Sequence, residues 1–322
     1  MTAMAGCLSD TLPFATCDVF TERRFQGNPL AIVEDADDLS TAQMQTMARE
    51  FNLSETIFVQ RPEDPAHDAK VRIFFPTAEI PFAGHPTIGC AIHLALESAP
   101  EGDFETCVTL EEVAGLVPAR VWRTDGRVRA EFRAPVLPHA PARGHLPEAE
   151  MLAEAVGLDP KAIGAGAHVS GLWQGGPSFL YVPVRDLETL AKARPIEPAW
   201  SRVMEGAFVD SAYLYTPLAA GHDADFRARM FSPTAGIPED PATGSAAAIM
   251  AAQLHACGAL SKAETHLSLH QGVEMGRPSA IGLRIVMLEG ALAEVHVSGS
   301  AVPVSRGRIH PPDGTSRPTN AA

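Results

Sequence analysis

The chain of 322 residues lacks most features that would place a protein outside the cell, in a membrane or on nucleic acid. Its 5 cysteines are an odd number and form no CxxC pair, which argues against a disulfide framework or a zinc site and favours a reducing compartment. Basic residues are in deficit, and the formal charge of −14 disfavours nucleic acid or an anionic membrane as a partner. No apolar run reaches transmembrane length, and the start, MTAMAGCLSD, has no basic or apolar signal region. We therefore expect a cytoplasmic protein.

The sequence does contain a repeat of domain size. Residues 72–81 read RIFFPTAEIP and residues 229–238 read RMFSPTAGIP, with seven of ten positions identical at an offset of 157. Upstream, QGNPLAIVEDADDLST from Gln26 matches QGGPSFLYVPVRDLET from Gln174 at six of sixteen positions, at an offset of 148. A period this long indicates a duplicated domain and not a solenoid. A duplicated enzyme tends to place its site between its halves.

Residues 135–147, PVLPHAPARGHLP, carry four prolines and a glycine. Such a segment interrupts helices and strand ladders, so it predicts an inter-domain linker. We expect an N-terminal domain over 14–134 and a C-terminal domain over 148–299, with residues 300–310 returning to the first domain. The last dozen residues are polar and Pro-rich, and we expect them to be disordered.

Each half is strand-rich and contains one strongly apolar helix, which directly follows the repeated PTAxIP. A helix that is apolar on most sides must be enclosed by other elements. The pattern therefore predicts an α+β fold of two pseudo-symmetric β-barrel-like domains, each wrapped around a central helix. A further, amphipathic helix through Phe51 has the capping-box spacing at Ser40 and Gln43.

The two apolar helices open at small-residue turns that differ between the halves. The first turn reads FAGHPTIG around Gly84, and the second reads EDPATGSAAA around Gly244. Helix N-termini present free N–H groups and a partial positive charge, so both turns are candidate carboxylate sites. The alternative is that Thr243 or Ser245 acts as an ordinary N-cap and that Pro86 simply begins a helix.

Three charged or titratable residues near these turns are candidates for chemistry. His85 lies at the first turn and Asp240 at the second, where Glu239 and Asp240 could also be a solvated loop pair. Glu55 begins an apolar strand, a position that is most often solvent-facing. If Glu55 instead points into a dry cleft, its pKa rises and it can transfer a proton near neutral pH.

Together these motifs resemble the PhzF-like phenazine-biosynthesis family. The resemblance spans nearly the whole chain in order, through DVFTERRFQGNPLAIV, AREFNLSETIFV, FAGHPTIG, EDPATGSAAA and QGVEMGRPS. It implies a diaminopimelate-epimerase-like fold with the site in the inter-domain cleft, no metal and no organic cofactor, and a homodimer. The family's known activity is isomerisation of trans-2,3-dihydro-3-hydroxyanthranilate, a proton shift along a conjugated cyclic acid.

The resemblance also implies roles for individual residues. The family's acid/base glutamate falls on Glu55, its active-site Gly-His pair on Gly84 and His85, and its Asp and Ser on Asp240 and Ser245. Related epimerases and proline racemases carry a cysteine at each helix-opening turn. Here Ala83 and Thr243 occupy those positions, which excludes two-thiol racemisation.

These inferences predict a cofactor-independent isomerase that moves a proton along a small conjugated carboxylic acid. Glu55 acts as the acid/base, Asp240 and His85 assist, and Gly84, Ser245, Gly244 and Thr243 bind the substrate carboxylate. The alternatives are a lyase or an epimerase/racemase on the same scaffold, and a non-catalytic protein that binds a small acid.

Overall fold

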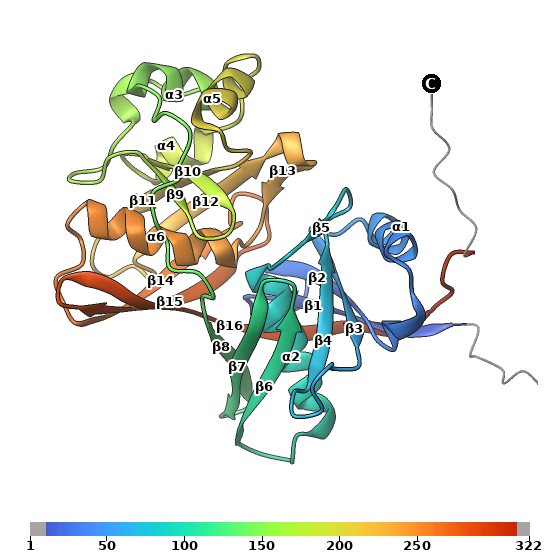
Figure 1. The fold of residues 1–322 in the computed structure, drawn as a ribbon. Coiled ribbons are helices and arrows are strands. Elements are labelled where there is room, and N and C mark those ends of the chain that lie inside the picture. The colour runs from blue at the N-terminus through green and yellow to red at the C-terminus, as the bar shows by residue number, and fades with distance from the viewer. Residues whose placement is uncertain (1–10, 314–322) are drawn as a thin grey trace, which may run out of the picture.

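The computed structural model describes residues 11–313, whose strands form one continuous sheet that curls around two helices (Figure 1). The expectation that residues 1–10 contain no signal region concerns residues outside this range. The expectation that the last dozen residues are disordered also falls mostly outside it. Within the described part of the chain, no helix is long and apolar enough to cross a membrane.

The first half is a closed eight-stranded barrel. The ring closes because β16 pairs antiparallel with both β8 and β1. Its strands follow in ring order: β1 (Leu12–Val19), β2 (Asn28–Val33), β3 (Glu55–Gln60), β4 (Ala69–Phe74), β6 (Phe104–Glu112), β7 (Gly115–Thr124), β8 (Arg127–Arg133) and β16 (Ala291–Ile309). The short β5 (Glu79–Ile80) pairs with β4. Helix α2 (Gly84–Ser98) fills the barrel, and α1 (Thr41–Phe51), which follows the 3₁₀ turn η1 (Ala36–Asp38), lies outside it (Figure 1).

The second half repeats this plan as an open sheet around α6 (Gly244–Ala256). Its strands, in sheet order from β16, are β15 (Ser279–Leu288), β14 (Glu264–Gln271), β12 (Phe226–Ser232), β11 (Ala212–Pro217), β10 (Ser178–Pro183) and β9 (Gly171–Gln174), with β13 (Ile237–Asp240) on β12. In the described residues only an isolated bridge, His139 to Gln174, joins β9 to the chain after β8. Outside lie α3 (Ala149–Val156), α4 (Leu187–Lys192) and α5 (Ala199–Ala207); η2 (Pro160–Ala162) and η3 (Pro233–Ala235) are single 3₁₀ turns.

The strand pairings repeat the duplication seen in the sequence. The parallel pairs β2–β3 and β4–β6 correspond to β10–β11 and β12–β14, and the antiparallel pair β3–β4 corresponds to β11–β12. Phe74 faces Thr56 in the first half, and Phe231, 157 residues later, faces Ala212 in the second. The repeated sequence therefore builds the same strand and hairpin twice.

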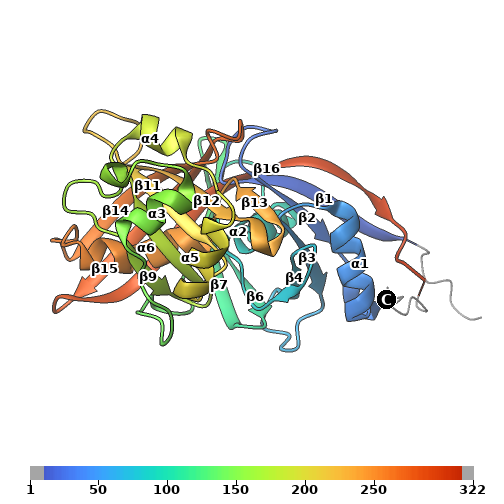
Figure 2. The same cartoon turned by 90° about the horizontal axis from the view of Figure 1, so that it is seen from above.

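Strand β16 joins the halves, because its first part belongs to the second sheet and its last part closes the first barrel (Figure 2). Residues 301–309 pair with β1, as the expected return of residues 300–310 requires. The domain boundaries themselves remain a prediction.

The sequence predicted some of the helices and missed others. The capping box of α1 is confirmed: Gln43 N donates to Ser40 Oγ, and Ser40 N donates to Gln43 Oε1. Helices α3 and α5 were not predicted; they pack on the outer face of the second sheet as a separate apolar cluster around the buried Trp200.

Candidate functional site

The two central helices begin against each other. A Cβ added to Gly84 would lie 3.0 Å from Gly244 Cα, and one added to Gly244 would lie 3.2 Å from Gly84 Cα. Glycine allows this approach without displacement, because an added Cβ would press on the opposite backbone. The duplication therefore brings two helix N-termini, with their partial positive charges, to one place.

Neither N-terminus is capped by a side chain. The N-cap residues of α2 and α6 are Ala83 and Thr243, and neither makes a capping hydrogen bond. Thr243 instead donates its hydroxyl to Asp240 Oδ2 at 2.6 Å. The ordinary-cap interpretation of Thr243 is thus wrong, and N–H groups at both turns remain available to an anion.

A cleft of about 480 Å³ opens at these turns, between the two halves. Its walls are largely apolar, and in the described part of the chain no Lys, Arg or His lines it. Of the predicted site residues, the cleft wall includes Glu55, Asp240, Thr243 and Ser245. Gly84, Gly244 and His85 lie in the layer behind them. A substrate carboxylate in this cleft would depend on helix N-termini and neutral donors, because no cationic side chain among residues 11–313 lines it.

Glu55 enters this cleft as the first residue of β3. Helix α1 ends at Phe51, and its C-cap residue Asn52 has a left-handed backbone conformation that turns the chain toward β3. There Glu55 pairs with Leu30 of the parallel strand β2. The residue is only 7 % exposed. Burial, and secondarily the negative charge of Asp240, raise the pKa of Glu55 well above its usual value. Its Oε2 atom is buried and makes no hydrogen bond within the described residues.

Asp240, the last residue of β13, is held by donors from both halves. Asn28 Nδ2 donates to Oδ1 at 2.9 Å, Ser54 Oγ donates to Oδ1 at 3.1 Å, and Thr243 donates to Oδ2. Burial raises the pKa of Asp240 to about 6, although these hydrogen bonds oppose the shift. Gln271 supports the same turn, since its Nε2 donates to Asp240 O at 2.8 Å and to Thr243 Oγ1 at 2.9 Å.

His85 is buried beside Glu55 as a neutral ring. Burial lowers its pKa to about 3. Its Nδ1 lies 3.3 Å from Asn28 Nδ2 and 3.2 Å from Glu55 Oε2, but the contact with Glu55 lacks hydrogen-bond alignment. Because a ring with this pKa carries no charge at neutral pH, the short distance to Glu55 is not an ion pair. His85 Nε2 is also buried without a hydrogen-bond partner in residues 11–313.

The structure thus gathers all seven predicted residues around one cleft, from both halves of the chain. Sequence reasoning missed Asn28, Ser54 and Gln271, which hold the second turn in place. For Asn28 a signal existed: the upstream repeat reads QGNP in the first half and QGGP in the second, so Asn28 is where the copies differ. Gln271 lies in the QGVEMGRPS motif, but nothing in its sequence context indicates its partners.

One group of side chains in residues 11–313 has the geometry to hold a metal ion. It consists of Glu34, His93 and Glu97, with His93 Nε2 at 3.0 Å from Glu34 Oε1. His93 lies on α2, eight residues beyond His85, and the group does not line the cleft.

A family model described as phenazine biosynthesis-like protein, PhzC-PhzF, matches residues 17–307. The chain belongs to this family. An uncharacterized isomerase of Mesorhizobium japonicum is 43% identical over 91% of this chain and 96% of its own length. The trans-2,3-dihydro-3-hydroxyanthranilate isomerase of Pseudomonas aeruginosa is 35% identical over 92% of this chain and 99% of its own. The resemblance found in the sequence is confirmed.

Solved structures confirm the fold. A PhzF family protein of Bacillus anthracis superposes with a TM-score of 0.81 at 25% identity, over 93% of this chain and 99% of that chain. A probable proline racemase of Agrobacterium radiobacter shares the fold at a TM-score of 0.60 and 14% identity, over 93% of each chain. The family therefore uses the α+β, diaminopimelate-epimerase-like scaffold that the sequence predicted.

Proposed function

We propose that this PhzC-PhzF family member is an isomerase that shifts a proton along a small conjugated carboxylic acid, using Glu55 as a single acid/base. The unpartnered, cleft-lining carboxylate of Glu55, with its raised pKa, is the observation that carries the proposal. Buried polar atoms normally have partners, so an unsatisfied carboxylate oxygen facing a cleft indicates a place kept for a substrate proton.

The substrate carboxylate would bind at the paired helix N-termini, with the Gly84 N–H and the Ser245 hydroxyl as donors. Each N-terminus favours an anion by about 0.3–1 kcal/mol at an exposed site and by more in a partly buried one. Phe75, Phe82 and Phe179 are among the apolar residues of the cleft wall, which suits an unsaturated ring or chain.

Glu55 would remove a proton from one carbon as a carboxylate and return it to another as the acid. Burial raises the pKa of Glu55 above its usual value, which is the direction that allows a carboxyl group to act as an acid as well as a base. Neutral His85 can donate or accept a hydrogen bond beside it without competing as a cation. Asp240, fixed by Asn28, Ser54 and Thr243, would orient the substrate and balance charge as the proton moves.

A mechanism with Glu55 as the single base agrees with a difference between the two halves. In register, Thr56 faces Phe74 and Ala212 faces the equivalent Phe231, so the position of Glu55 corresponds to Ser211 in the second half. No second carboxylate occupies the symmetry-related strand start, and Ala83 and Thr243 replace the racemase thiols. These features favour proton transfer on one face over two-base epimerisation. Homodimer formation and cytoplasmic location remain predictions.

Deuterium wash-in from D₂O tests the proposal, using trans-2,3-dihydro-3-hydroxyanthranilate and a panel of other unsaturated acids. Glu55→Gln should fold normally and lose about 10²- to 10⁴-fold in exchange at carbon, the usual contribution of a positioned acid/base. Glu112→Gln is the matched control, since Glu112 is also a buried acid in the first half but does not line the cleft.

Wash-in by Glu55→Gln at the wild-type rate would disprove its role. Ligand binding without exchange in the wild-type protein would favour the non-catalytic alternative. Product analysis separates isomerisation from elimination or epimerisation, because each gives a different product from the same acid.

A further inference from the structure

The C-terminal part of α2 carries side chains that can bind a metal ion and that the proposed isomerisation does not use. They are Glu34, which directly follows β2, and His93 and Glu97, which are four residues apart on α2. One nitrogen or carboxylate oxygen from each residue lies within 4.8 Å of the other two. We call this group the His93 cluster. His93 is nine residues beyond Gly84, so the cluster lies about 13 Å along α2 from the cleft.

The distances within the His93 cluster suit a tetrahedral divalent cation. His93 Nε2 lies 3.0 Å from Glu34 Oε1 and 3.8 Å from Glu97 Oε1. Ligands at the usual Zn²⁺ bond lengths are about 3.3–3.5 Å apart in a tetrahedron, so each separation needs to change by only about 0.3 Å. Imidazole and carboxylate are both ordinary Zn²⁺ ligands, and solvent would supply the fourth.

The two acids of the cluster have no cationic partner other than the histidine. Within residues 11–313, neither Glu34 nor Glu97 forms an ion pair with a Lys or Arg side chain. Arg306 lines a small hollow beside His93 but forms no ion pair with either acid. Two carboxylates at such a distance repel each other unless a proton or a cation lies between them. A divalent cation would balance both negative charges at once.

A second histidine with two acidic neighbours shows a different arrangement. His296 Nε2 lies 2.8 Å from Glu294, and its Nδ1 lies 3.6 Å from Glu131, so the acids approach different ring nitrogens. Each of these acids also pairs with an arginine, Glu294 with Arg133 and Glu131 with Arg284. In the His93 cluster both acids approach the same nitrogen, which leaves their oxygens and that nitrogen around one point.

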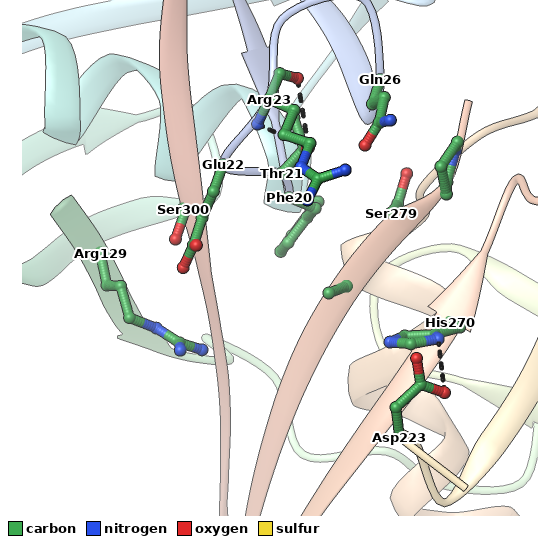
Figure 3. Close-up of a pocket in the computed structure, with 12 residues that line it drawn as sticks. Phe20, Thr21, Glu22, Arg23, Gln26, Arg129, Asp223, His270, Ser279 and Ser300 are labelled. Carbon is green, nitrogen blue, oxygen red and sulfur yellow. Dashed lines mark hydrogen bonds and ion pairs between the residues drawn. The ribbon is translucent and has the colours of Figure 1, made fainter. Parts of the chain in front are cut away.

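Charged side chains at a hollow of about 470 Å³ between the halves do not converge in this way. Arg23 and Arg129 line that hollow together with the acids Glu22 and Asp223. Figure 3 shows the two arginines well apart and Asp223 directed at His270. Mixed and separated charges of this kind do not form a site for one ion.

The second half fills the place corresponding to His93 with neutral groups. Gln253 occupies that position in α6, nine residues after the first residue of the helix. Its Oε1 accepts a hydrogen bond from Trp173 Nε1 at 2.8 Å, and its Nε2 donates to Tyr215 Oη at 3.0 Å and to Val169 O at 2.6 Å. The amide network of the second half is thus complete without a ligand, whereas the first half places ionisable groups there.

We propose that the His93 cluster binds one Zn²⁺ ion through His93 Nε2 and one oxygen each of Glu34 and Glu97. The ion joins the end of β2 to the last turns of α2 and so stabilises the first barrel. His93 is buried and held by the barrel, while the side chain of Glu97 is 45 % exposed, which gives the ion a path from solvent. The site goes beyond the proposed isomerisation and lies outside the cleft, so either proposal can fail without the other.

Isothermal titration calorimetry with Zn²⁺, on the full chain after removal of metal with EDTA, measures affinity and stoichiometry. One ion should bind at the cluster, and His93→Gln should weaken binding at least about a hundredfold, because even partners outside the ligand set contribute about 10- to 100-fold. Glutamine is the residue that the second half has at this position, so the variant should fold. Glu34→Gln should also weaken binding, by at least about tenfold. His296→Gln is the matched control and should bind as wild type does.

Cobalt(II) identifies the ligands, because its visible absorption reports tetrahedral coordination. The wild-type chain should show these bands without thiolate charge-transfer absorption in the near ultraviolet, and His93→Gln should lack them. Thiolate bands would assign the ion to cysteines, such as the exposed Cys107, and would overturn the proposal. Absence of Zn²⁺ binding, wild-type affinity in His93→Gln, or equal loss in His296→Gln would overturn it as well.

Amide hydrogen exchange tests whether the ion joins the two elements. Saturating Zn²⁺ should slow exchange in peptides covering residues 33–36 and 93–98, with exchange in α6 unchanged. Unaltered exchange in both peptides with the ion bound would exclude the proposed link between β2 and α2.

Discussion

The two halves differ at the end of the strand that lies beside each central helix. Leu110 pairs with Ala69, and Leu269 pairs with Phe226, 157 residues after Ala69, so the last residues of β6 and β14 correspond. These are Glu112 in the first half and Gln271 in the second. The amide of Gln271 bonds to the turn before α6, whereas the acid of Glu112 bonds to Thr87 inside α2. At corresponding positions, the second half therefore has a neutral amide, Gln271, and the first half has a titratable acid, Glu112.

This difference has a functional counterpart. Gln271 bonds directly to Asp240 and Thr243 in the turn before α6, whereas Glu112 bonds to Thr87, within the first turn of α2. In the proposed mechanism, the second half would provide a preorganised set of donors, and the first half would provide the proton-transfer group, Glu55.

The largest difference in stability between equivalent substitutions in the two halves is expected at the repeated arginine, Arg72 in the first half and Arg229 in the second. Arg72 and Arg229 each stack on the phenylalanine two residues later and pair with a glutamate through two hydrogen bonds. Arg229 is buried and also donates to backbone carbonyls at the end of α4, whereas Arg72 is more exposed. Arg229→Met should therefore lower the free energy of unfolding by about 3–5 kcal/mol, and Arg72→Met by about 1 kcal/mol or less. Urea denaturation measures both.

Removing the acid as well sharpens this test. Arg229→Met leaves Glu239 half-buried without its partner, and that unpaired charge supplies much of the cost. The double variant Arg229→Met/Glu239→Leu should therefore recover part of the lost stability. Equal effects of the two single variants would show that the copies are equivalent at this position.

The next effect concerns Glu112 and pH. Thr87 Oγ1 lies 2.8 Å from Ala83 O and 2.7 Å from Glu112 Oε1. A hydroxyl has one proton, so both contacts are satisfied at once only when a protonated Glu112 donates to Thr87. Burial raises the pKa of Glu112 to about 8. The folded state thus binds this proton more tightly than the unfolded chain does, and stability is lost as pH rises between about 4.5 and 8.

Glu112→Gln should remove this pH dependence, because glutamine imitates the protonated acid and gives the first half the residue of the second. The variant should match wild type near pH 5 and exceed it by a few kcal/mol near pH 8.5, at about 1.4 kcal/mol per pKa unit. Urea denaturation at the two pH values measures the difference. A wild-type slope retained in Glu112→Gln would place the titration elsewhere.

Sequence reasoning succeeded where one copy could be compared with the other. The repeat predicted the enclosed helices α2 and α6, the facing turns at Gly84 and Gly244, and the candidate residues near them. It failed for Gln271 and Ser54, whose partners are distant in sequence and are set by sheet register. It also failed for α3 and α5, which have no strong apolar counterpart in the first half. Strand register and long-range hydrogen bonds depend on how the complete sheet assembles. They cannot be inferred from a single sequence without an alignment.

The smallest effect tests the point where the halves meet. Gly84→Ala places a Cβ 3.0 Å from Gly244 Cα and 3.1 Å from Gly244 C, atoms that belong to rigid backbone. Overpacking of this kind costs about 1–3 kcal/mol, and separation of the N-termini should also weaken binding of the substrate carboxylate. Gly206→Ala, inside α5 with nothing within 4 Å, is the control and should stabilise by about 0.5–1 kcal/mol. If both variants stabilise the protein, the backbones of the two helices are not in contact where they begin. The inference of an anion site formed by both N-termini would then be wrong.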